Sequence, residues 1–290
     1  MSSAEQDEKA DEDEKAYGDQ PGAEARIDTG VASIARVYDA MLGGKDNFDV
    51  DRVIRDQIRE LAPESIVAAQ DGRDFLMRVT RYLAREIGVD QFLDCGSGLP
   101  TAENTHQIAQ NVNPDARVVY VDNDPVVLAH GRALLGENDR THFVPGDLAE
   151  PRKLLGEPAV TANIDFGRPL ALYQVGTLHH VSDEQRPGEI MAEYVDALPS
   201  GSYVVLSHFH NPRDGSAVGE FADRAEQVLL NSSMGSGWFR TRAEVLAFLG
   251  GLEVLEPGLG PVADWWPAGP RDEPLRPAQQ VYIGAVARKR

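Results

Sequence analysis

The chain has 290 residues, 42% of them hydrophobic, and a formal net charge of −19. Its 47 acidic residues outnumber the 28 basic ones, which disfavours partners with phosphate backbones or anionic lipid surfaces. The single cysteine, Cys95, excludes an internal disulfide. No apolar run approaches the ~18 residues of a membrane span, and the first residues lack the layout of a signal peptide. We therefore expect a cytoplasmic protein that binds neither nucleic acid nor membranes.

The first 88 residues divide into two segments of different composition. Residues 1–28 are mostly acidic and small, with almost no large apolar side chains, and we expect a disordered acidic tail. Residues 29–88 have apolar side chains at helical spacing. Helices are predicted over 33–42, ended by Gly43-Gly44, and over 49–61 and 64–88, separated at Pro63. We interpret this segment as an N-terminal helical cap.

Short apolar strands alternate with helices over residues 89–290. Such alternation is typical of βαβ units and a mostly parallel sheet, so we predict a doubly wound α/β domain that forms one compact unit with the cap. Strands are expected at 91–94, 118–122, 141–144, 169–176 and 202–208, with two late strands at 252–255 and 280–287. Helices are expected at 102–111 and 125–135.

Unusual residues follow the predicted strands at the edge where ligands bind in open α/β sheets. Glycines after the first strand let backbone N–H groups approach a ligand closely, although a tight turn alone would also explain them. Acids follow three strands. Their carboxylates can accept hydrogen bonds from ribose hydroxyls and an adenine amine and can pair with a cationic amino acid group, and they fit such a cofactor better than a pyrophosphate. Thr101 also stands where a dinucleotide motif has its third glycine. The expected cofactor residues here are Asp94, Gly96, Ser97, Gly98, Asp122, Asn123, Gly146, Asp147, Leu148 and Gly176.

Several segments resemble one actinobacterial family of S-adenosylmethionine methyltransferases, once classed as a domain of unknown function, within the class I superfamily. The segments are IARVYD (34–39) running into LGGKDNF (42–48), DCGSGLPT (94–101), VYVDNDP (119–125) and GSYVVLSH (201–208). The resemblance spans about residues 31–270. It implies S-adenosyl-L-methionine as cofactor and a seven-stranded Rossmann-like sheet of order 3-2-1-4-5-7-6 with an antiparallel strand seven. Pro100 departs from the general class I pattern, which often has a third glycine there.

Polar residues of the predicted cap are further candidates for the cofactor site. Tyr38, Lys45 and Asn47 could close over the cofactor, and Lys45 or Arg73 could hold its carboxylate. The alternative for the 43–48 loop is a helix C-cap with solvated charges.

Histidines after the fourth and fifth strands are candidates for the acceptor side. His179 falls where similar small-molecule O-methyltransferases have a general base, and histidine can take a proton near neutral pH. The alternative is a loop histidine bonded to backbone or water. His208 and His210 could also belong to an acceptor site, and the spacing of these histidines follows no zinc signature, so no metal is expected.

The sequence thus predicts an S-adenosylmethionine-dependent methyltransferase that acts on a small molecule, at oxygen or nitrogen. Two alternatives stay open: a non-catalytic protein that binds S-adenosylmethionine or S-adenosylhomocysteine, and an NAD-dependent oxidoreductase. The acceptor and the oligomeric state are left open.

Overall fold

The computed structural model describes residues 27–101, 103–135, 139–266 and 273–290. The predicted acidic tail therefore lies outside the described residues, apart from residues 27 and 28. None of the helices within these ranges is both long and apolar enough to cross a membrane.

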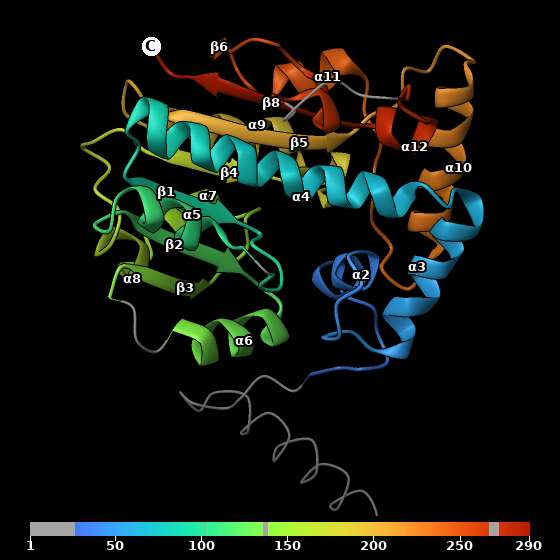
Figure 1. Cartoon of the computed structure of the whole chain (residues 1–290), viewed down its shortest axis with the longest axis horizontal. Helices are drawn as coiled ribbons and strands as arrows, with labels where there is room; N and C mark the ends of the chain where they lie inside the picture. The colour runs from blue at the N-terminus through green and yellow to red at the C-terminus, as the bar shows by residue number, and fades with distance from the viewer. Residues whose placement is uncertain (1–26, 102, 136–138, 267–272) are drawn as a thin grey trace, which may run out of the picture.

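A mostly parallel sheet forms the centre of the molecule (Figure 1). Its path is β3-β2-β1-β4-β5-β8-β6, and β8 runs antiparallel to β5 and β6. The predicted order is confirmed, with β8 in the place of strand seven and the two-residue β7 as an additional partner of β8. The strands are β1 (Gln91–Cys95), β2 (Arg117–Asp122), β3 (Thr141–Pro145), β4 (Ala171–Gln174), β5 (Tyr203–Phe209), β6 (Glu253–Val254), β7 (Gly260–Pro261) and β8 (Tyr282–Arg288).

Helices cover both faces of the sheet and the ends of its strands. In Figure 1, α4 and α5 lie on one face, and α7 and α9 on the other. The predicted helices 49–61 and 125–135 match α3 and α6, whereas the predicted helix 64–88 ends its α-helical part at Tyr82 and continues as a π-helical turn, Leu83–Ile87. The α-helices are α2 (Ile34–Met41), α3 (Asp49–Leu61), α4 (Ser65–Tyr82), α5 (Thr105–Val112), α6 (Pro125–Leu135), α7 (Pro151–Leu155), α8 (Pro158–Thr161), α9 (Pro187–Ala197), α10 (Ala217–Asn231), α11 (Arg242–Ala247) and α12 (Pro277–Gln280).

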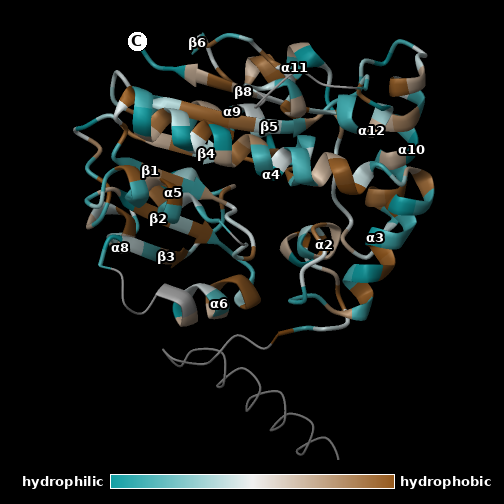
Figure 2. Ribbon diagram, viewed as in Figure 1, coloured by the Kyte–Doolittle hydropathy of each residue, from teal (hydrophilic) through white to brown (hydrophobic). Residues whose placement is uncertain are grey.

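The central strands are buried on both faces because helices cover both. All five residues of β1 and all four of β4 are buried, and brown, hydrophobic segments run through the sheet in Figure 2. This continuous burial explains why these strands read as apolar runs rather than as alternating patterns.

A second, smaller core forms beyond the carboxyl ends of the parallel strands. It joins α2, α3, α10 and α12 through residues such as Ile54 and Phe221. Ser33 caps the N-terminus of α2, where its Oγ accepts the N–H of Arg36 at 3.5 Å. These helices form a wall that faces the strand ends, and the space between the two is where the candidate site lies.

Candidate active site

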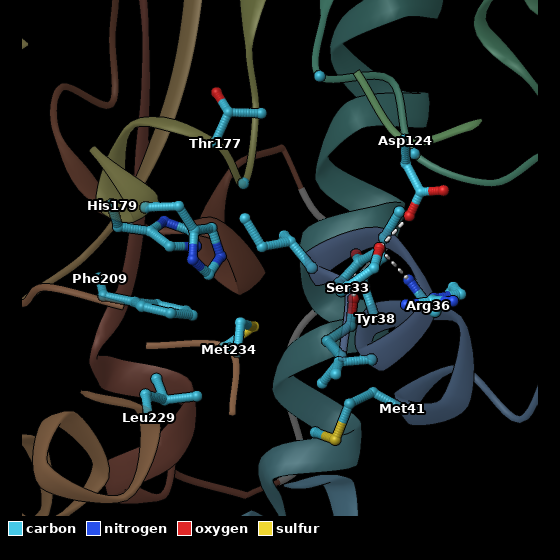
Figure 3. A pocket seen from close by; sticks show the side chains of 18 of the residues that line it. Ser33, Arg36, Tyr38, Met41, Asp124, Thr177, His179, Phe209, Leu229 and Met234 are labelled. Carbon is cyan, nitrogen blue, oxygen red and sulfur yellow. Dashed lines mark hydrogen bonds between the residues drawn. The ribbon is translucent and has the colours of Figure 1, made fainter. Parts of the chain in front are cut away.

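A cavity of about 700 Å³ lies between the carboxyl ends of β1, β2, β3 and β4 and the helices α2, α4 and α10. Its volume is within the range of ~300–1,000 Å³ that is common for small-molecule sites. Figure 3 shows Asp124 and Ser33 on one side of it and Phe209, Met234 and Leu229 on the other. The cavity therefore has the position expected for a ligand site in an open α/β sheet.

The turn after β1 needs both of its glycines. Gly96 and Gly98 have φ of +76° and +67°, in the left-handed region that favours glycine. A Cβ on Gly96 would also lie 2.4 Å from Cγ2 of Thr177, whereas a Cβ on Gly98 would meet nothing within 4 Å. Between them, the buried Oγ of Ser97 has no hydrogen-bond partner among the described residues. The turn thus leaves room and a polar group for a ligand.

Asp122 joins the end of β2 to the glycine turn. Its Oδ2 accepts the N–H of Gly98 at 2.8 Å, and its Oδ1 accepts the N–H of Asp124 at 2.9 Å. The residue is 7% exposed, and burial raises the pKa of its carboxyl. Asn123 lies beside it on the cavity and is exposed. Hydrogen-bond donors of a ligand would offset the cost of burying this carboxylate.

The N-terminal segment forms one wall of the cavity. Ser33 donates a hydrogen bond through its Oγ to Asp124, which connects the start of α2 to the end of β2. Tyr38, on α2, donates its hydroxyl to the carbonyl of Ala69 at 2.9 Å. The sequence reasoning did not select Ser33 or Asp124, although the Asp124-Pro125 pair directly after a strand was a usable signal.

A second cavity of about 180 Å³ adjoins the first and shares Arg73, Ser97 and Gly98 with it. Asp94 lines this smaller cavity and accepts the Thr105 hydroxyl at 3.0 Å. Burial raises the pKa of Asp94 to about 6, against the opposing effect of the Thr105 hydrogen bond. Arg73 donates through Nη2 to the Glu103 carbonyl, and its buried Nε has no partner among the described residues. The smaller cavity therefore brings together one carboxylate and one guanidinium.

Most of the expected cofactor residues line these cavities. Lys45 and Asn47 do not: Lys45 is exposed, and Asn47 donates through Nδ2 to Asp39 at 2.7 Å and to the Gly44 carbonyl at 3.0 Å. Asp94 lines only the smaller cavity. The sequence-predicted site residues that line the larger cavity are Tyr38, Arg73, Gly96, Ser97, Gly98, Asp122, Asn123, Gly146, Asp147, Leu148, Gly176 and His179.

His179 and His180 both line the larger cavity, after β4. His179 is 2% exposed, its ring stacks on Phe209 at 3.6 Å, and its buried Nδ1 has no partner among the described residues. Burial, with the neighbouring His180, His208 and Arg240, lowers the pKa of His179 well below 6.5. The Nδ1 of His180 is 2.8 Å from the Ser236 hydroxyl, and burial lowers the pKa of His180 to about 3. Both imidazoles are therefore neutral at pH 7.

His208 and His210 are not among the residues that line the cavity, so its lining lends no support to their candidacy for an acceptor site. The Nδ1 of His208 donates to the Phe209 carbonyl at 2.7 Å, and its Nε2 accepts from Nη1 of Arg240 at 2.9 Å. The Nδ1 of His210 is 3.1 Å from the Arg240 carbonyl. The buried Arg240 also donates to the carbonyls of Leu178 at 3.3 Å and Val181 at 2.8 Å. These groups hold the loop that carries His179 and His180.

Among the described residues, no cluster of three or more His, Cys, Asp or Glu side chains could hold a metal ion.

Comparison with known proteins identifies relatives along nearly the whole chain. The family model described as S-adenosyl methyltransferase matches residues 20–290. The crystal structure of a candidate methyltransferase from Thermobifida fusca YX is 42% identical and superposes with a TM-score of 0.85, over 91% of this chain and 97% of that one. A DUF574 family protein from Streptomyces avermitilis is 36% identical, with a TM-score of 0.84, over 91% of this chain and all of the other. The search of curated proteins gave no match. The chain therefore belongs to the S-adenosyl methyltransferase family and is an S-adenosylmethionine-dependent methyltransferase.

Proposed function

We propose that the larger cavity binds S-adenosylmethionine beside the glycine turn and that the enzyme transfers its methyl group to an oxygen or nitrogen of a small molecule. The observation that carries this proposal is the continuity of one cavity from Asp122 and Gly98 to His179 and Phe209. Cofactor and acceptor would therefore share one enclosed space, where alignment of the reactants and exclusion of water accelerate the transfer.

The residues around the glycine turn fit the cofactor. Asp122 would accept the ribose hydroxyls, and Asp147, which is exposed at the cavity after β3, would accept the adenine amine. Arg73 would bind the carboxylate of the amino acid portion, and Asp94 its ammonium group, from the smaller cavity. The raised pKa of Asp94 supports this role, since a bound cation would favour its charged form. Lys45 has no part in this arrangement.

The acceptor side has to align a nucleophile and receive its proton. When bound, the cofactor supplies a methyl group on a positively charged sulfur, and an acceptor lone pair bonds to that carbon while the carbon–sulfur electron pair stays on sulfur. His179 is neutral and lies on the cavity after β4, so its imidazole can take the proton of a hydroxyl or amine. Because the pKa of His179 is low, it is a weak base, and its contribution to the rate would lie at the low end of general-base catalysis.

A methyl-transfer screen tests this proposal. The full-length protein is incubated with S-adenosylmethionine carrying a tritiated methyl group and with a panel of hydroxyl and amine compounds. We expect labelled small-molecule product together with S-adenosylhomocysteine. Tight cofactor binding without any product would favour the non-catalytic alternative, and tight binding of NAD instead would favour the oxidoreductase.

A further inference from the structure

We infer that the methyl acceptor is an uncharged molecule with a flat, apolar ring system, and that it binds in the half of the larger cavity that lies beyond His179. This inference rests on the proposed function. We call this region the apolar half; it is lined by Met41, Phe209, Phe221, Leu229, Met234 and Phe239.

The apolar half is separate from every charged group on the cavity wall. Asp122 and Asp124 lie at the end of β2, Asp147 follows β3, and Arg73 is bonded to the carbonyl of Glu103. Asp28 precedes α2 and accepts the N–H of Gly30 at 2.8 Å. Arg36 is bonded to the carbonyls of Asp28 and Val31 and is 3.5 Å from Asp51. Figure 3 shows Arg36 and Asp124 across the cavity from Phe209, Met234 and Leu229.

Charged acceptors would bind poorly in the apolar half. His179 and His180, which line the cavity after β4, are both neutral at pH 7 because burial lowers their pKa values. A carboxylate or an ammonium group placed there would lose its hydration without gaining an ion pair among the described lining residues, which is costly. An uncharged acceptor has no such cost.

The shape of the wall favours a flat ring. His179, Phe209 and Phe239 form a stacked column, with ring centroids 3.6 Å and 4.9 Å apart and interplanar angles of 23° and 22°. Tyr282 contacts Phe209 at 5.6 Å and lies close against α4, because Gly72 has no side chain to block its ring. Because His179 and Phe239 cover its two faces, Phe209 presents its ring edge to the cavity, and a ring edge packs well against the face of another ring. Met234, on the same side as Phe209, and Met41, on α2 across the cavity, have flexible thioether side chains that adapt to ring edges (Figure 3).

The position of the apolar half relative to His179 sets the orientation of the acceptor. A ring in the apolar half would place its edge toward His179, which lies where the apolar half meets the residues after β4. A hydroxyl or amine on that edge would then face both the methyl group and a neutral imidazole.

Binding of three probes of matched shape tests this inference. Naphthol, naphthoate and naphthylmethylammonium are titrated calorimetrically into the full-length protein saturated with S-adenosylhomocysteine at neutral pH. We expect naphthol to bind and each charged probe to bind at least about tenfold more weakly, because its charge is buried unpaired. Equal or tighter binding of a charged probe would overturn the inference while leaving the proposed function intact. Failure of S-adenosylhomocysteine itself to bind would instead overturn both.

The variant Met234→Asp places a negative charge in the apolar half and tests whether naphthol binds there. Naphthol binding would bury the new carboxylate without a partner, so the variant should weaken naphthol binding by at least about tenfold. It should leave the affinity for S-adenosylhomocysteine within about twofold. The matched control is Val53→Asp, on a side chain that is 55% exposed and does not line the cavity, and it should change neither affinity. Unchanged naphthol binding in Met234→Asp would show that the probe binds elsewhere and would contradict the inference. The wild-type probe series remains decisive if this variant does not fold.

Discussion

The close contact between Gly96 and Thr177 predicts that two neighbouring glycines of one turn respond very differently to the same substitution. Gly96→Ala and Gly98→Ala both place alanine at a positive φ, +76° and +67°. That conformation costs an L-residue roughly 1–2 kcal/mol. Only at position 96 does the new methyl group meet another side chain, Cγ2 of Thr177 at 2.4 Å. Overpacking of this kind typically adds ~1–3 kcal/mol.

We therefore expect the free energy of unfolding to fall by about 2–5 kcal/mol in Gly96→Ala and by about 1–2 kcal/mol in Gly98→Ala. The assay is urea unfolding of the ligand-free protein, followed by circular dichroism. Thr177→Ser removes Cγ2 but keeps the hydroxyl that donates to Gln174 at 2.8 Å. Added to Gly96→Ala, it should restore about 1–3 kcal/mol, and added to Gly98→Ala it should restore nothing.

Two results would refute this reasoning. If Gly96→Ala were as stable as Gly98→Ala, the turn would have room for a side chain that the contact distance excludes. If Thr177→Ser failed to restore stability in the Gly96→Ala background, the cost would arise from the backbone or from Leu148, whose Cδ2 is 3.3 Å from the added Cβ, rather than from Cγ2 of Thr177.

Three further predictions concern the polar residues of the site and its supporting loop. Asp122→Ala should weaken S-adenosylhomocysteine binding by ~1.5–3 kcal/mol in calorimetry, the scale of a hydrogen bond to a charged group, and unchanged affinity in a folded variant would remove Asp122 from the site. Once an acceptor is known, His179→Ala should lower kcat by about a hundredfold, the lower end of the range for general-base catalysis, since its lowered pKa makes it a weak base. The wild-type kcat should show no histidine-like midpoint near pH 6.5, and such a midpoint would contradict the neutral imidazole. Burial lowers the pKa of His208 to about 3, so its contribution to stability is complete above pH 6.5 and is lost as the pH falls toward 3. Between these values, the free energy of unfolding should depend on pH more steeply in the wild type than in His208→Asn, by up to ~1.4 kcal/mol per pH unit, and parallel curves would contradict this.

The sequence was sufficient for the sheet because its signals are local. Each central strand is a short apolar run followed by glycine or an acid, and the chain alternates these runs with helices. The carboxyl ends of parallel strands meet at one edge, so residues as far apart as Gly98 and Asp122 were correctly expected to lie close together. The third predicted helix did not anticipate the change at Tyr82, since nothing in the composition separates Tyr82 from the π-helical turn that follows.

The acceptor side could not be predicted in the same way, because its residues are distant in sequence and have no motif. Phe209 is the last residue of β5, Leu229 belongs to α10 and Met234 lies in the loop after α10. Only tertiary packing brings these residues to one wall. The histidines were similarly ambiguous. His180, which the sequence did not single out, lines the cavity, whereas His208 is fully engaged by Arg240 and a backbone carbonyl.

Tertiary structure was also needed to distinguish Lys45 from Arg73 as the residue that could bind the cofactor's carboxylate. In sequence Lys45 was as good a candidate as Arg73 for binding a carboxylate, since both are cations of the predicted N-terminal cap. The structure places Arg73 on both cavities and leaves Lys45 exposed after the end of α2.

The crystal structure of the complex with S-adenosylhomocysteine is the most direct test of the central claim. We expect the adenosine portion to contact Asp122 and Asp147, the amino acid portion to reach Arg73 past Ser97, and the sulfur to face the apolar half beside His179. Electron density for the ligand outside the larger cavity, or in it with Asp122 unengaged, would contradict the account.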